Sequence, residues 1–531
     1  MQKPTKGSGP YYAIGIDLGT SGPKVALVED TGKLMAIERG HTDTIFIPGG
    51  GAEQDANQWW SEIKRTMKKV IAVAGIPKEK IVAIGTCSTY SNTIPIDENG
   101  DPVMNEMIWM DSRGASYNAA IMKGFPMVKG YGLGKLLKMV KRVGIPPLLS
   151  GIDCVGHMGF IKTQRPEVYR KTYKFLEPMD FITFRLTGKV TSTIGNIMAT
   201  MSVDTRKWGN IQYDDELVKM IGIDKAKLPD LLPNNGIVGS LDPSIAKEMD
   251  LMPSTQVLCG SNDNMAAALG AGVANDYESA IIVGTSLYMT SFVPFKKTDL
   301  DHLILTIPSL LENRYSVMGV QGSGGKNIEF FLGNLIFPQD KFGTGPLPDN
   351  AYETLDHLAA EAPAGCNGAM FLPWMTGTIV PAENPYAKSV FFNLGMETHR
   401  KHICRSVMEG IALNNLWTKK PMEKFLGRKI ESYRLSGGGA RSNTFCQILA
   451  DVLGVPIHAA VDPLAVSAKG TALGAFITLG YRDKGELSGI AKVRQTYNPN
   501  ESTRMLYDKM LTQFVDLHKR TKPVFKALNA K

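Results

Sequence analysis

The stretch with the clearest capacity for chemistry joins a carboxylate to a turn of glycine and hydroxyl residues. Asp263 lies between an apolar run that ends in glycine, Val257–Gly260, and a helix-forming run, Met265–Leu269. The start of a helix favours negative charge. A second apolar run, Ala280–Val283, ends in the turn Gly284–Ser286, whose backbone N–H groups can wrap a phosphate. The alternative for Asp263 is that it only caps the helix, a position that Asp favours strongly.

A similar loop lies near the beginning of the chain, between the predicted strands Ala13–Ile16 and Val25–Val28. It starts with Asp17, ends with Lys24, and is rich in glycine and hydroxyl residues between them. Its N–H groups can surround phosphate oxygens, and Lys24 adds a positive charge. Asp17 can hold a hydrated Mg²⁺, because that ion keeps several waters and takes one or two carboxylates. The alternative is a tight hairpin with no ligand, and the spacing is not that of a Walker loop or a dinucleotide fingerprint.

Two polar segments in the first half are suited to a ligand with many hydroxyl groups. Thr86–Asn92 follows the predicted strand Ile81–Gly85, and α/β proteins usually place ligands beyond strand ends. Further on, Trp109, Asp111 and Arg113 alternate along the chain, so they share one face if the segment is extended. The ring can cover C–H faces while the charged groups bind hydroxyls. The alternative is a salt bridge beside a core tryptophan.

Three consecutive glycines follow a predicted strand in the second half. The strand is Tyr433–Ser436, the glycines are Gly437–Gly439, and a predicted helix extends through Leu453. Glycines between a strand and a helix permit the close approach of a flat or charged ligand.

The framework that positions these segments is predicted to have more than one domain. A chain of 531 residues is too long for one core and predicts two to four domains. We place a boundary near Leu251, which gives residues 1–251 and 252–531. The second half loosely repeats the order of acid, phosphate loop and hairpin, so we expect two similar α/β domains that face a cleft. The tail, Ser502–Leu528, is predicted to be a helix on the solvated surface.

Composition excludes several classes of function. A hydrophobic fraction of 43% and a charged fraction of 21% are ordinary for a soluble globular protein. The net charge of +8 is scattered, which favours anionic substrates over nucleic acid. Six cysteines without paired spacing indicate a reducing cytoplasm. We expect no signal peptide and no contact with a membrane, because no apolar run has the required character or length.

Taken in order, these motifs resemble the FGGY family of carbohydrate kinases and, within it, the xylulokinase-like branch. The segments that carry the resemblance cover nearly the whole chain: Ile14–Val28, Trp109–Arg113, Asp180–Lys189, Gly260–Gly272, Val283–Ser286, Ser406–Ala412 and Ser436–Asn443. The resemblance implies two ribonuclease-H-like domains of the actin, hexokinase and heat-shock chaperone type. ATP and a sugar are expected in the central cleft between them.

The resemblance also implies a role for each matching residue. Asp263 is expected to be the general base that removes the proton from the sugar hydroxyl, and Asp17 is expected to lie near Mg²⁺. The expected ATP-binding residues form two phosphate loops, an adenosine-binding turn and one glycine that closes over the nucleotide: Gly19, Thr20, Ser21, Lys24, Gly284, Thr285, Ser286, Gly438, Gly439, Ala440, Asn443 and Gly325. The expected sugar wall consists of Tyr90, Ser91, Trp109, Asp111 and Asn264.

Some segments depart from the family pattern. Xylulokinases carry Gln-Met-His-Gly where this chain has Thr89–Asn92, so the histidine that would bind the ketose is absent. Gly377–Ile379 replaces a Gly-Glu-Arg run, and Lys469 lies where the last core helix usually opens with an acid. These changes leave the predicted transfer residues in place and concern the identity of the sugar.

The predicted function is phosphorylation of a primary hydroxyl of a small sugar or polyol by ATP with Mg²⁺, with a ketopentose such as xylulose as the first candidate. The resemblance also suggests a homodimer. One alternative is a kinase for a different polyol or a sugar-derived signal molecule. Another is a non-catalytic regulator that binds sugar or nucleotide. A third is an actin-like ATPase with a protein client, which would leave Trp109–Arg113 without a purpose.

Overall fold

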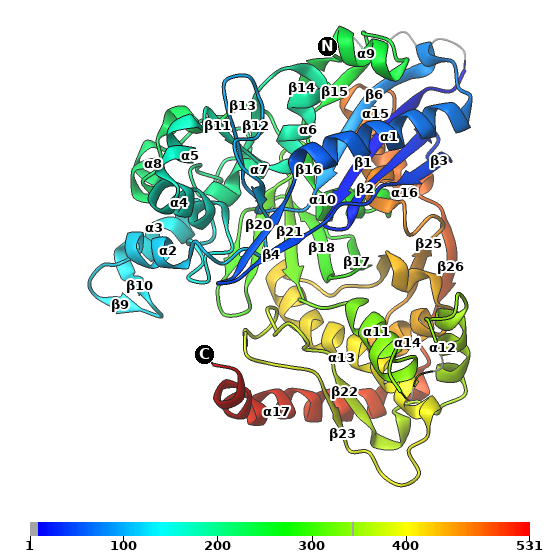
Figure 1. Ribbon diagram of the computed structural model, residues 1–531. Coiled ribbons are helices and arrows are strands. Elements are labelled where there is room, and N and C mark those ends of the chain that lie inside the picture. The colour runs from blue at the N-terminus through cyan, green and yellow to red at the C-terminus, as the bar shows by residue number, and fades with distance from the viewer. Residues whose placement is uncertain (1–8, 342, 344, 531) are drawn as a thin grey trace.

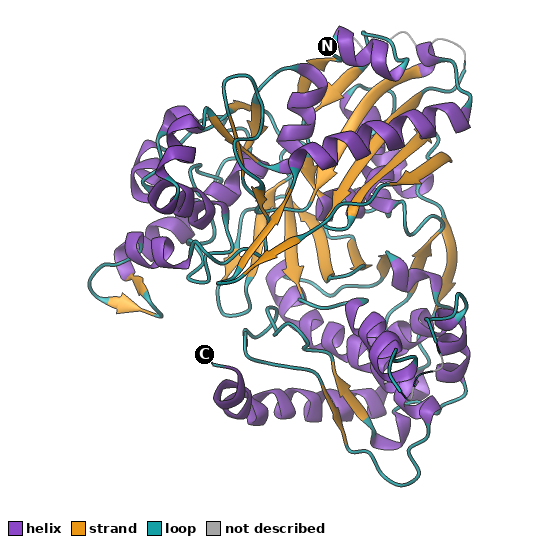
Figure 2. Cartoon of the chain, in the orientation of Figure 1, coloured by secondary structure: helices purple, strands orange, loops and turns teal. Residues whose placement is uncertain are grey.

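The computed structural model describes residues 9–341, 343 and 345–530, and it shows two α/β halves that are each built on one large mixed sheet (Figures 1 and 2). The strands of the first sheet, in spatial order, are β14 (Ile237–Ser240), β15 (Gln256–Leu258), β6 (Ile81–Ser88), β1 (Tyr12–Gly19), β2 (Gly22–Glu29) and β3 (Leu34–Arg39), and β16 (Ser261–Asn262) also pairs with β6. The strands of the second sheet are β19 (Thr298–Asp299), β20 (Ile304–Pro308), β21 (Tyr315–Val320), β18 (Leu287–Val293), β17 (Ser279–Val283), β24 (Tyr433–Ser436), β25 (Ile457–Ala460) and β26 (Val493–Tyr497).

Helices cover both sheets and form a lobe beside the first one (Figure 2). In the first half they are α1 (Ala56–Ala74), α2 (Ala115–Ile121), α3 (Leu133–Arg142), α4 (Cys154–Gln164), α5 (Pro166–Lys171), α6 (Pro178–Thr187), α7 (Ile194–Ile197), α8 (Asp215–Ile221) and α9 (Pro243–Met249). Those that follow are α10 (Asp263–Gly270), α11 (Lys326–Phe331), α12 (Ala351–Ala360), α13 (Arg400–Leu426), α14 (Asn443–Leu453), α15 (Val466–Thr478), α16 (Leu487–Ile490) and α17 (Arg504–Asn529).

Short strands complete the structure outside the two large sheets. They are β4 (Ile45–Ile47), β5 (Gly51–Gln54), β7 (Ile94–Ile96), β8 (Glu106–Met107), β9 (Met127–Val128), β10 (Tyr131–Gly132), β11 (Lys174–Leu176), β12 (Thr191–Thr193), β13 (Asp230–Leu232), β22 (Met370–Leu372) and β23 (Val390–Phe392). The pair β5 and β8 matters for function, because it leads into the Trp109 segment.

The two large sheets share one motif, a β-hairpin with a parallel strand beside it. In the first sheet, β1 pairs antiparallel with β2 and parallel with β6. In the second, β17 pairs antiparallel with β18 and parallel with β24. Strands that are buried on both faces read as nearly continuous apolar runs, which explains why both hairpins were visible in the sequence. The repeated motif is the one expected of two ribonuclease-H-like halves.

Helix α1 shows how local sequence covers the outer face of the first sheet. Asp55 caps its N-terminus by accepting a hydrogen bond from the Asn57 N–H, and Gly75 ends it in the left-handed conformation at φ 60°, as glycine does readily. Trp59, Ile63 and other apolar residues at helical spacing are buried against the sheet. Burial of each such side chain contributes about 1.5–3 kcal/mol.

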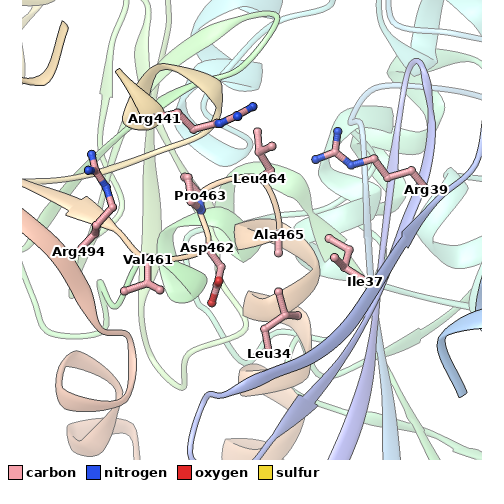
Figure 3. A pocket seen from close by; sticks show the side chains of 10 residues that line it. All are labelled: Leu34, Ile37, Arg39, Arg441, Val461, Asp462, Pro463, Leu464, Ala465 and Arg494. Atoms are coloured by element: carbon pink, nitrogen blue, oxygen red, sulfur yellow. The ribbon is translucent and has the colours of Figure 1, made fainter. Parts of the chain in front are cut away.

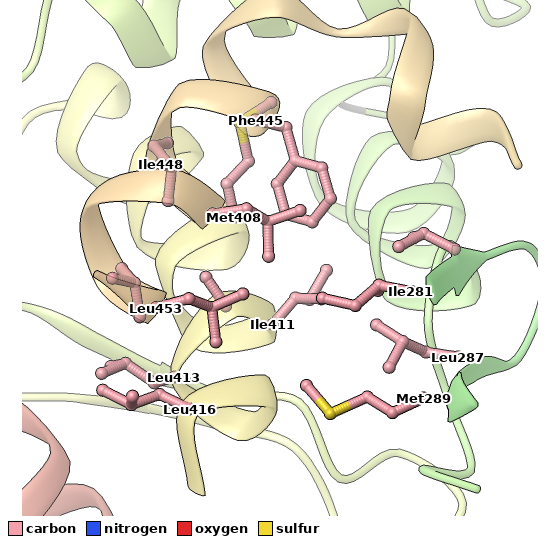
Figure 4. Close-up of a cluster of buried hydrophobic side chains, with 14 of the residues drawn as sticks. Ile281, Leu287, Met289, Met408, Ile411, Leu413, Leu416, Phe445, Ile448 and Leu453 are labelled. Carbon is pink, nitrogen blue, oxygen red and sulfur yellow. The ribbon is translucent and has the colours of Figure 1, made fainter. Parts of the chain in front are cut away.

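The second half has a large apolar core between its sheet and α13 and α14. Figure 4 shows Ile281 and Met289 of the sheet, Met408 and Ile411 of α13, and Phe445 of α14 within one cluster of buried side chains. This core fixes the strands that carry the second phosphate loop.

Helices α10 and α15 cross where the two halves meet, in a contact that leaves no room for side chains. A Cβ atom on Gly270 would lie 1.8 Å from the Val466 carbonyl oxygen, and one on Gly470 would lie 1.7 Å from that of Ala266. Helix α15 also packs on the first sheet, although its sequence lies near the end of the chain. The glycines at these two positions permit the close approach of the two helices.

The predicted boundary near Leu251 lies between α9 and β15. Both β15 and β16, which come after it, pair with β6 of the first sheet. The division into residues 1–251 and 252–531 stays a prediction, and the chain enters its second sheet only at β17. None of the described helices is long and apolar enough to cross a membrane.

Candidate active site

Asp263 is the first residue of α10, and its neighbour Asn262 is the helix cap. Asn262 has an extended backbone, and its side chain accepts a hydrogen bond of 2.9 Å from the Met265 N–H. The capping interaction therefore belongs to Asn262, and the alternative in which Asp263 only caps the helix is wrong. Asp263 is half-buried at the end of β16, next to the first sheet.

The electrostatic surroundings make Asp263 a better base than an ordinary aspartate. Burial and the negative charge of Asp17 raise the pKa of Asp263 to about 7, while the positive charge of Lys24 opposes this rise. A carboxyl group with a pKa near the working pH can accept a proton efficiently and still be largely ionised. Strongly shifted groups of this kind are often found at active sites.

Asp17 and Lys24 form an ion pair on the first hairpin. They lie opposite each other in the register of β1 and β2, and Lys24 Nζ is 2.9 Å from Asp17 Oδ2. The negative charge of Asp17 is the main reason that the pKa of Lys24 is raised. The Asp17 side chain is only 6% exposed, and its other oxygen accepts a long hydrogen bond of 3.6 Å from the Cys87 thiol. A hydrated Mg²⁺ fits this oxygen, since Mg²⁺ uses one or two carboxylates together with waters and phosphate oxygens.

The tip of the first hairpin is connected to the predicted sugar wall. Gly19 and Gly22 pair at its end, and the Thr20 carbonyl accepts a 2.7 Å hydrogen bond from Gln54. The Trp109 Nε1–H donates to the Thr20 hydroxyl at 3.2 Å. Ser21 is exposed at the tip. The first phosphate loop and the Trp109 segment are thus in direct contact.

The second hairpin forms a turn that is joined by the start of α11. The Gly284 N–H donates to the Ser286 carbonyl at 3.0 Å, and Thr285 is exposed. The Gly325 N–H donates to the Gly284 carbonyl at 2.7 Å. Gly325 therefore lies beside this phosphate loop, although it is separated from Gly284 by about forty residues of the chain.

The predicted adenosine-binding turn packs directly on the end of β17. Gly437 has φ 83°, and a Cβ atom there would lie 2.4 Å from the Val283 carbonyl oxygen, so only glycine fits. Gly438 is exposed and Ala440 is buried. A Cβ atom on Gly439 would lie 2.9 Å from that of Val283. The turn and the second phosphate loop thus lie side by side, as both were predicted to bind one nucleotide.

Asn443, the last residue of the predicted nucleotide site, is held by two donors. Its Oδ1 accepts a 2.6 Å hydrogen bond from the Tyr497 hydroxyl and a 2.9 Å bond from Arg494 Nη1. Arg494 also donates to the Ala440 carbonyl at 3.1 Å. Sequence reasoning did not find Arg494 or Tyr497, because both lie on β26, about fifty residues further along the chain.

Tyr288 on the second hairpin lies near the carboxylates of Asp17 and Asp263. Burial raises the pKa of Tyr288 on β18 well above its ordinary value, and the charges of Asp263 and Asp17 raise it further. Such an effect requires the groups to be close. The strand that follows the second phosphate loop therefore lies near Asp17 and Asp263.

The loop with Tyr90 and Ser91 is held in place by a buried glutamate that sequence reasoning missed. Ser91 has the left-handed φ of 71°, and the Ser91 and Asn92 N–H groups donate to the Glu177 carboxyl at 3.2 and 3.0 Å. Asn92 Oδ1 in turn accepts a 2.6 Å hydrogen bond from the Trp109 N–H. The only signal in the sequence was a glutamate directly before the proline that starts α6. Glu177 thus positions both predicted parts of the sugar wall.

The Glu177 carboxyl is mostly protonated at neutral pH. Burial raises its pKa to about 8. Glu106, a second buried carboxyl, has its pKa raised well above the ordinary value by burial and by the charge of Glu177. Neither Glu106 oxygen has a hydrogen-bond partner within the described part of the chain. Two buried carboxyl groups with raised pKa values therefore lie behind the sugar loop.

Trp109 and Asp111 point to different surroundings. Trp109 is 40% exposed and Asp111 is completely buried. The Asp111 carboxylate accepts hydrogen bonds from the Ala52 N–H at 2.9 Å and from Arg113 Nη2 at 2.6 Å, and Arg113 also pairs with Glu53. The alternative interpretation was a salt bridge beside a core tryptophan. Its salt bridge is confirmed, but its placement of Trp109 in the core is wrong. Direct contact of Asp111 with a sugar stays a prediction; its observed contacts hold Arg113 and the backbone of Ala52.

The remaining residues of the predicted sugar wall are Tyr90 and Asn264. The Tyr90 hydroxyl donates to the Gly195 carbonyl at 2.9 Å. Asn264 follows Asp263 on α10 and is buried, and its Oδ1 has no hydrogen-bond partner among residues that the structure describes. An unpaired buried oxygen costs about 1–3 kcal/mol, so a donor on a ligand would stabilise it.

Transfer of a phosphoryl group depends on positioning and charge neutralisation, and this site offers a base, a cation and two turns rich in N–H groups. The fold and the site thus define a phosphotransferase of the actin and hexokinase type. The sequence profiles of the N-terminal and C-terminal domains of the FGGY family of carbohydrate kinases match residues 12–270 and 279–479. The chain belongs to this family, and it is a carbohydrate kinase that transfers a phosphoryl group from ATP to a sugar hydroxyl.

Known proteins resemble the chain over most of its length. The xylulose kinase of Bacillus subtilis (strain 168) is 25% identical over 442 residues, which is 83% of each chain. The gluconokinase of Bacillus licheniformis is 24% identical over 520 residues, or 95% of each chain. The crystal structure of a ligand-bound xylulose kinase from Lactobacillus acidophilus superposes with a TM-score of 0.83 at 21% identity and covers 98% of this chain and 100% of that one. The predicted two-domain α/β fold is confirmed.

Proposed function

We propose that this kinase phosphorylates a primary hydroxyl group of a ketopentose such as xylulose, with Asp263 as the general base. The observation that carries this proposal is the position of Asp263, at the start of α10 and within the electrostatic reach of Asp17 and Lys24. The similarity to the xylulose kinase of Bacillus subtilis supports the choice of sugar.

In the proposed reaction, Asp263 accepts the proton of the attacking hydroxyl as the new oxygen–phosphorus bond forms. The unpaired Oδ1 of Asn264 accepts a hydrogen bond from a neighbouring hydroxyl and so orients the sugar. Trp109 covers a C–H face, while the backbone of Ser91 and Asn92 is fixed by Glu177. Because Asp263 has a raised pKa, it is a strong enough base to assist proton removal in the transition state.

Other residues of the chain would hold the nucleotide. Gly19, Thr20 and Ser21 on the first hairpin and Gly284–Ser286 on the second would present N–H groups and hydroxyls to the phosphates. Lys24 would place a positive charge beside the transferred group, and Asp17 would hold Mg²⁺, which neutralises phosphate charge when bound. Gly325, Gly438, Gly439, Ala440 and Asn443 would contact the rest of ATP.

The charges near the sugar loop favour a neutral sugar over gluconate, the second candidate that the similarity to a gluconokinase raises. A carboxylate on the substrate needs an available cation. Arg113 is the arginine of this wall, and Asp111 and Glu53 already neutralise it at 2.6 Å each.

The test is the release of ADP from Mg²⁺ and ATP with a panel of ketopentoses, aldopentoses, hexuloses, polyols and gluconate. We expect turnover with one ketopentose, reduced by about 10² or more in the Asp263→Asn variant. Turnover with gluconate alone would contradict the proposed substrate. If no compound raises ADP release but one binds, the regulator alternative replaces the kinase mechanism proposed for Asp263.

A homodimer, a cytoplasmic location and the division at Leu251 are further proposals from the sequence. Light scattering of the purified chain tests the first, because a dimer doubles the mass of 57.9 kDa.

A further inference from the structure

A cavity of about 430 Å³ lies between the two halves, outside the residues predicted to bind ATP (Figure 3). One wall is β3 of the first half, with Leu34, Ile37 and Arg39. The other wall belongs to the second half and consists of Arg441, Arg494 and the loop 461–465 that follows β25. Arg441 belongs to the turn that carries Gly438 to Ala440, but those residues do not line the cavity.

Three guanidinium groups surround this cavity. Figure 3 shows Arg39 and Arg441 extending toward one another from opposite sides. Neither guanidinium has an ion-pair or hydrogen-bond partner in residues 9–341, 343 and 345–530. The third, Arg494, also lines the cavity, and its guanidinium is held by hydrogen bonds to the Ala440 carbonyl and to Asn443 Oδ1.

One carboxylate lines the cavity, and it is already engaged. Asp462 Oδ2 lies 3.4 Å from the ammonium group of the buried Lys469. In Figure 3 the Asp462 carboxylate points away from Arg441. The three arginines are therefore not neutralised from within the cavity, and two cations that face each other without an anion repel one another.

The rest of the lining is apolar. Leu34, Ile37 and Leu464 contribute aliphatic side chains, together with Val461, Pro463 and Ala465. The volume is within the range of about 300–1,000 Å³ that is usual for sites of small molecules. An arginine guanidinium matches a phosphate group with two parallel hydrogen bonds. The cavity thus has the chemistry for an anionic group attached to a compact apolar body.

We propose that this cavity binds a small molecule with a phosphate group, separately from the ATP that serves the transfer reaction. Its phosphate bridges Arg39 of the first half and Arg441 of the second. A ligand that touches both halves favours the domain arrangement in which both arginines reach it. Arg494, which lines the cavity, also donates hydrogen bonds to Ala440 and Asn443. A ligand in the cavity would therefore be coupled to the predicted adenosine turn through Arg494.

Isothermal titration calorimetry on the full chain tests this proposal with two probes, inorganic phosphate and phenyl phosphate. Both are added in the presence of Mg²⁺ and a saturating non-hydrolysable ATP analogue. We expect phenyl phosphate to bind with a Kd below about 10 mM. Tighter binding of phenyl phosphate than of inorganic phosphate would identify a phosphorylated metabolite as the natural ligand, and the reverse order would identify free phosphate.

The variants Arg39→Ala and Arg441→Ala are each expected to weaken this binding at least tenfold. Arg520→Ala is the matched control, because Arg520 is exposed on α17 and pairs with Asp516, far along the chain from the cavity lining. All three residues are exposed, so the variants should unfold at nearly the wild-type temperature. Arg39→Ala should also leave sugar turnover without added phosphate unchanged.

Two results would overturn the proposal. One is that neither probe binds to the wild-type protein, or that both probes bind equally well to the wild type, Arg39→Ala and Arg441→Ala. The other is binding that disappears when the ATP analogue saturates the protein, which would make the cavity part of the nucleotide site. The measurement needs no sugar, so its outcome is independent of the ketopentose proposal.

Discussion

The two phosphate hairpins have the same topology, but one carries charged side chains and the other does not. The first carries the ion pair of Asp17 and Lys24 on its paired strands. The second, from Ser279 to Val293, has no charged residue at all. One hairpin therefore changes the pKa of its neighbours and can hold a metal, while the other offers neutral N–H and hydroxyl donors. The comparison teaches that a duplicated framework can divide the work of phosphoryl transfer between charge and hydrogen bonding.

The residues that support the sugar loop and those that support the second hairpin also differ in their capacity to carry charge. The sugar loop of the first half rests on Glu177 and, behind it, on Glu106, two buried carboxyl groups with raised pKa values. The second hairpin rests on an apolar core that includes Ile281 and Met289. We therefore expect pH to affect the first half of the site far more than the second.

The largest effect is expected at Asp263. Asp263→Asn should lower kcat by about 10²–10⁴, because a general base contributes that much. Asp263 acts in its ionised form and has a pKa of about 7, so wild-type kcat should be half-maximal near pH 7 and level off above about pH 8. Rates measured from pH 5.5 to about 8.5 check this, and a flat wild-type profile would remove Asp263 from the role of base.

Lys24→Met removes the cation from the charged hairpin. We expect the KM for ATP to rise by about ten- to a hundredfold, since hydrogen bonds to charged groups are worth about 1.5–3 kcal/mol. Loss of the positive charge should also raise the pKa of Asp263, because Lys24 now lowers it. The acid limb of the pH–rate profile should move to higher pH, and an unmoved limb would show that the two groups are not coupled.

Glu177→Ala should raise the KM for the sugar about tenfold with little change in kcat, since the Ser91 and Asn92 N–H groups lose their acceptor at about 1 kcal/mol each. Glu177→Gln should restore part of the loss in KM, because its amide oxygen can accept from one of the two N–H groups while its NH2 group cannot accept from the other. A Gln variant as weak as Ala would show that the charged form is the one that matters.

The comparison of the wild type with Glu177→Gln also gives a prediction for the pH dependence of stability. The pKa of Glu177 rises from 4.5 to about 8 on folding, so folding favours its protonated form. This contribution is fully present below pH 4.5 and is lost as pH rises through about 8. Relative to Glu177→Gln, the wild-type free energy of unfolding should therefore fall between these pH values. Urea denaturation of both proteins at each pH provides the measurement.

The smallest effect is expected in the neutral hairpin. Thr285→Val removes one exposed hydroxyl and no charge, so the KM for ATP should rise only a few-fold, in line with about 0.5–1.5 kcal/mol for one neutral hydrogen bond. The pH–rate profile should stay where it is. A shift as large as that of Lys24→Met would break the contrast between the two hairpins.

The sequence by itself determined the local elements of the site. Both hairpins, the turn before α10 and the glycine turn after β24 were predicted, because buried strands read as apolar runs and tight turns need glycine. The predicted helix end at Leu453 and the short helix that carries Asp263 also follow from neighbouring residues alone. These features depend on contacts within a few residues of each other.

Only the tertiary structure decided which distant side chains complete the site. Glu177 holds Ser91 from 86 residues away, and Arg494 holds Asn443 across 51 residues. The tail was predicted to lie on the solvated surface, yet Tyr507 of α17 is fully buried and its hydroxyl donates to Glu409 at 2.8 Å. A hydrophobic pattern shows which residues are buried, but not which polar partner meets them. That partner is fixed only when the elements pack, since each buried polar group must then find its hydrogen bond.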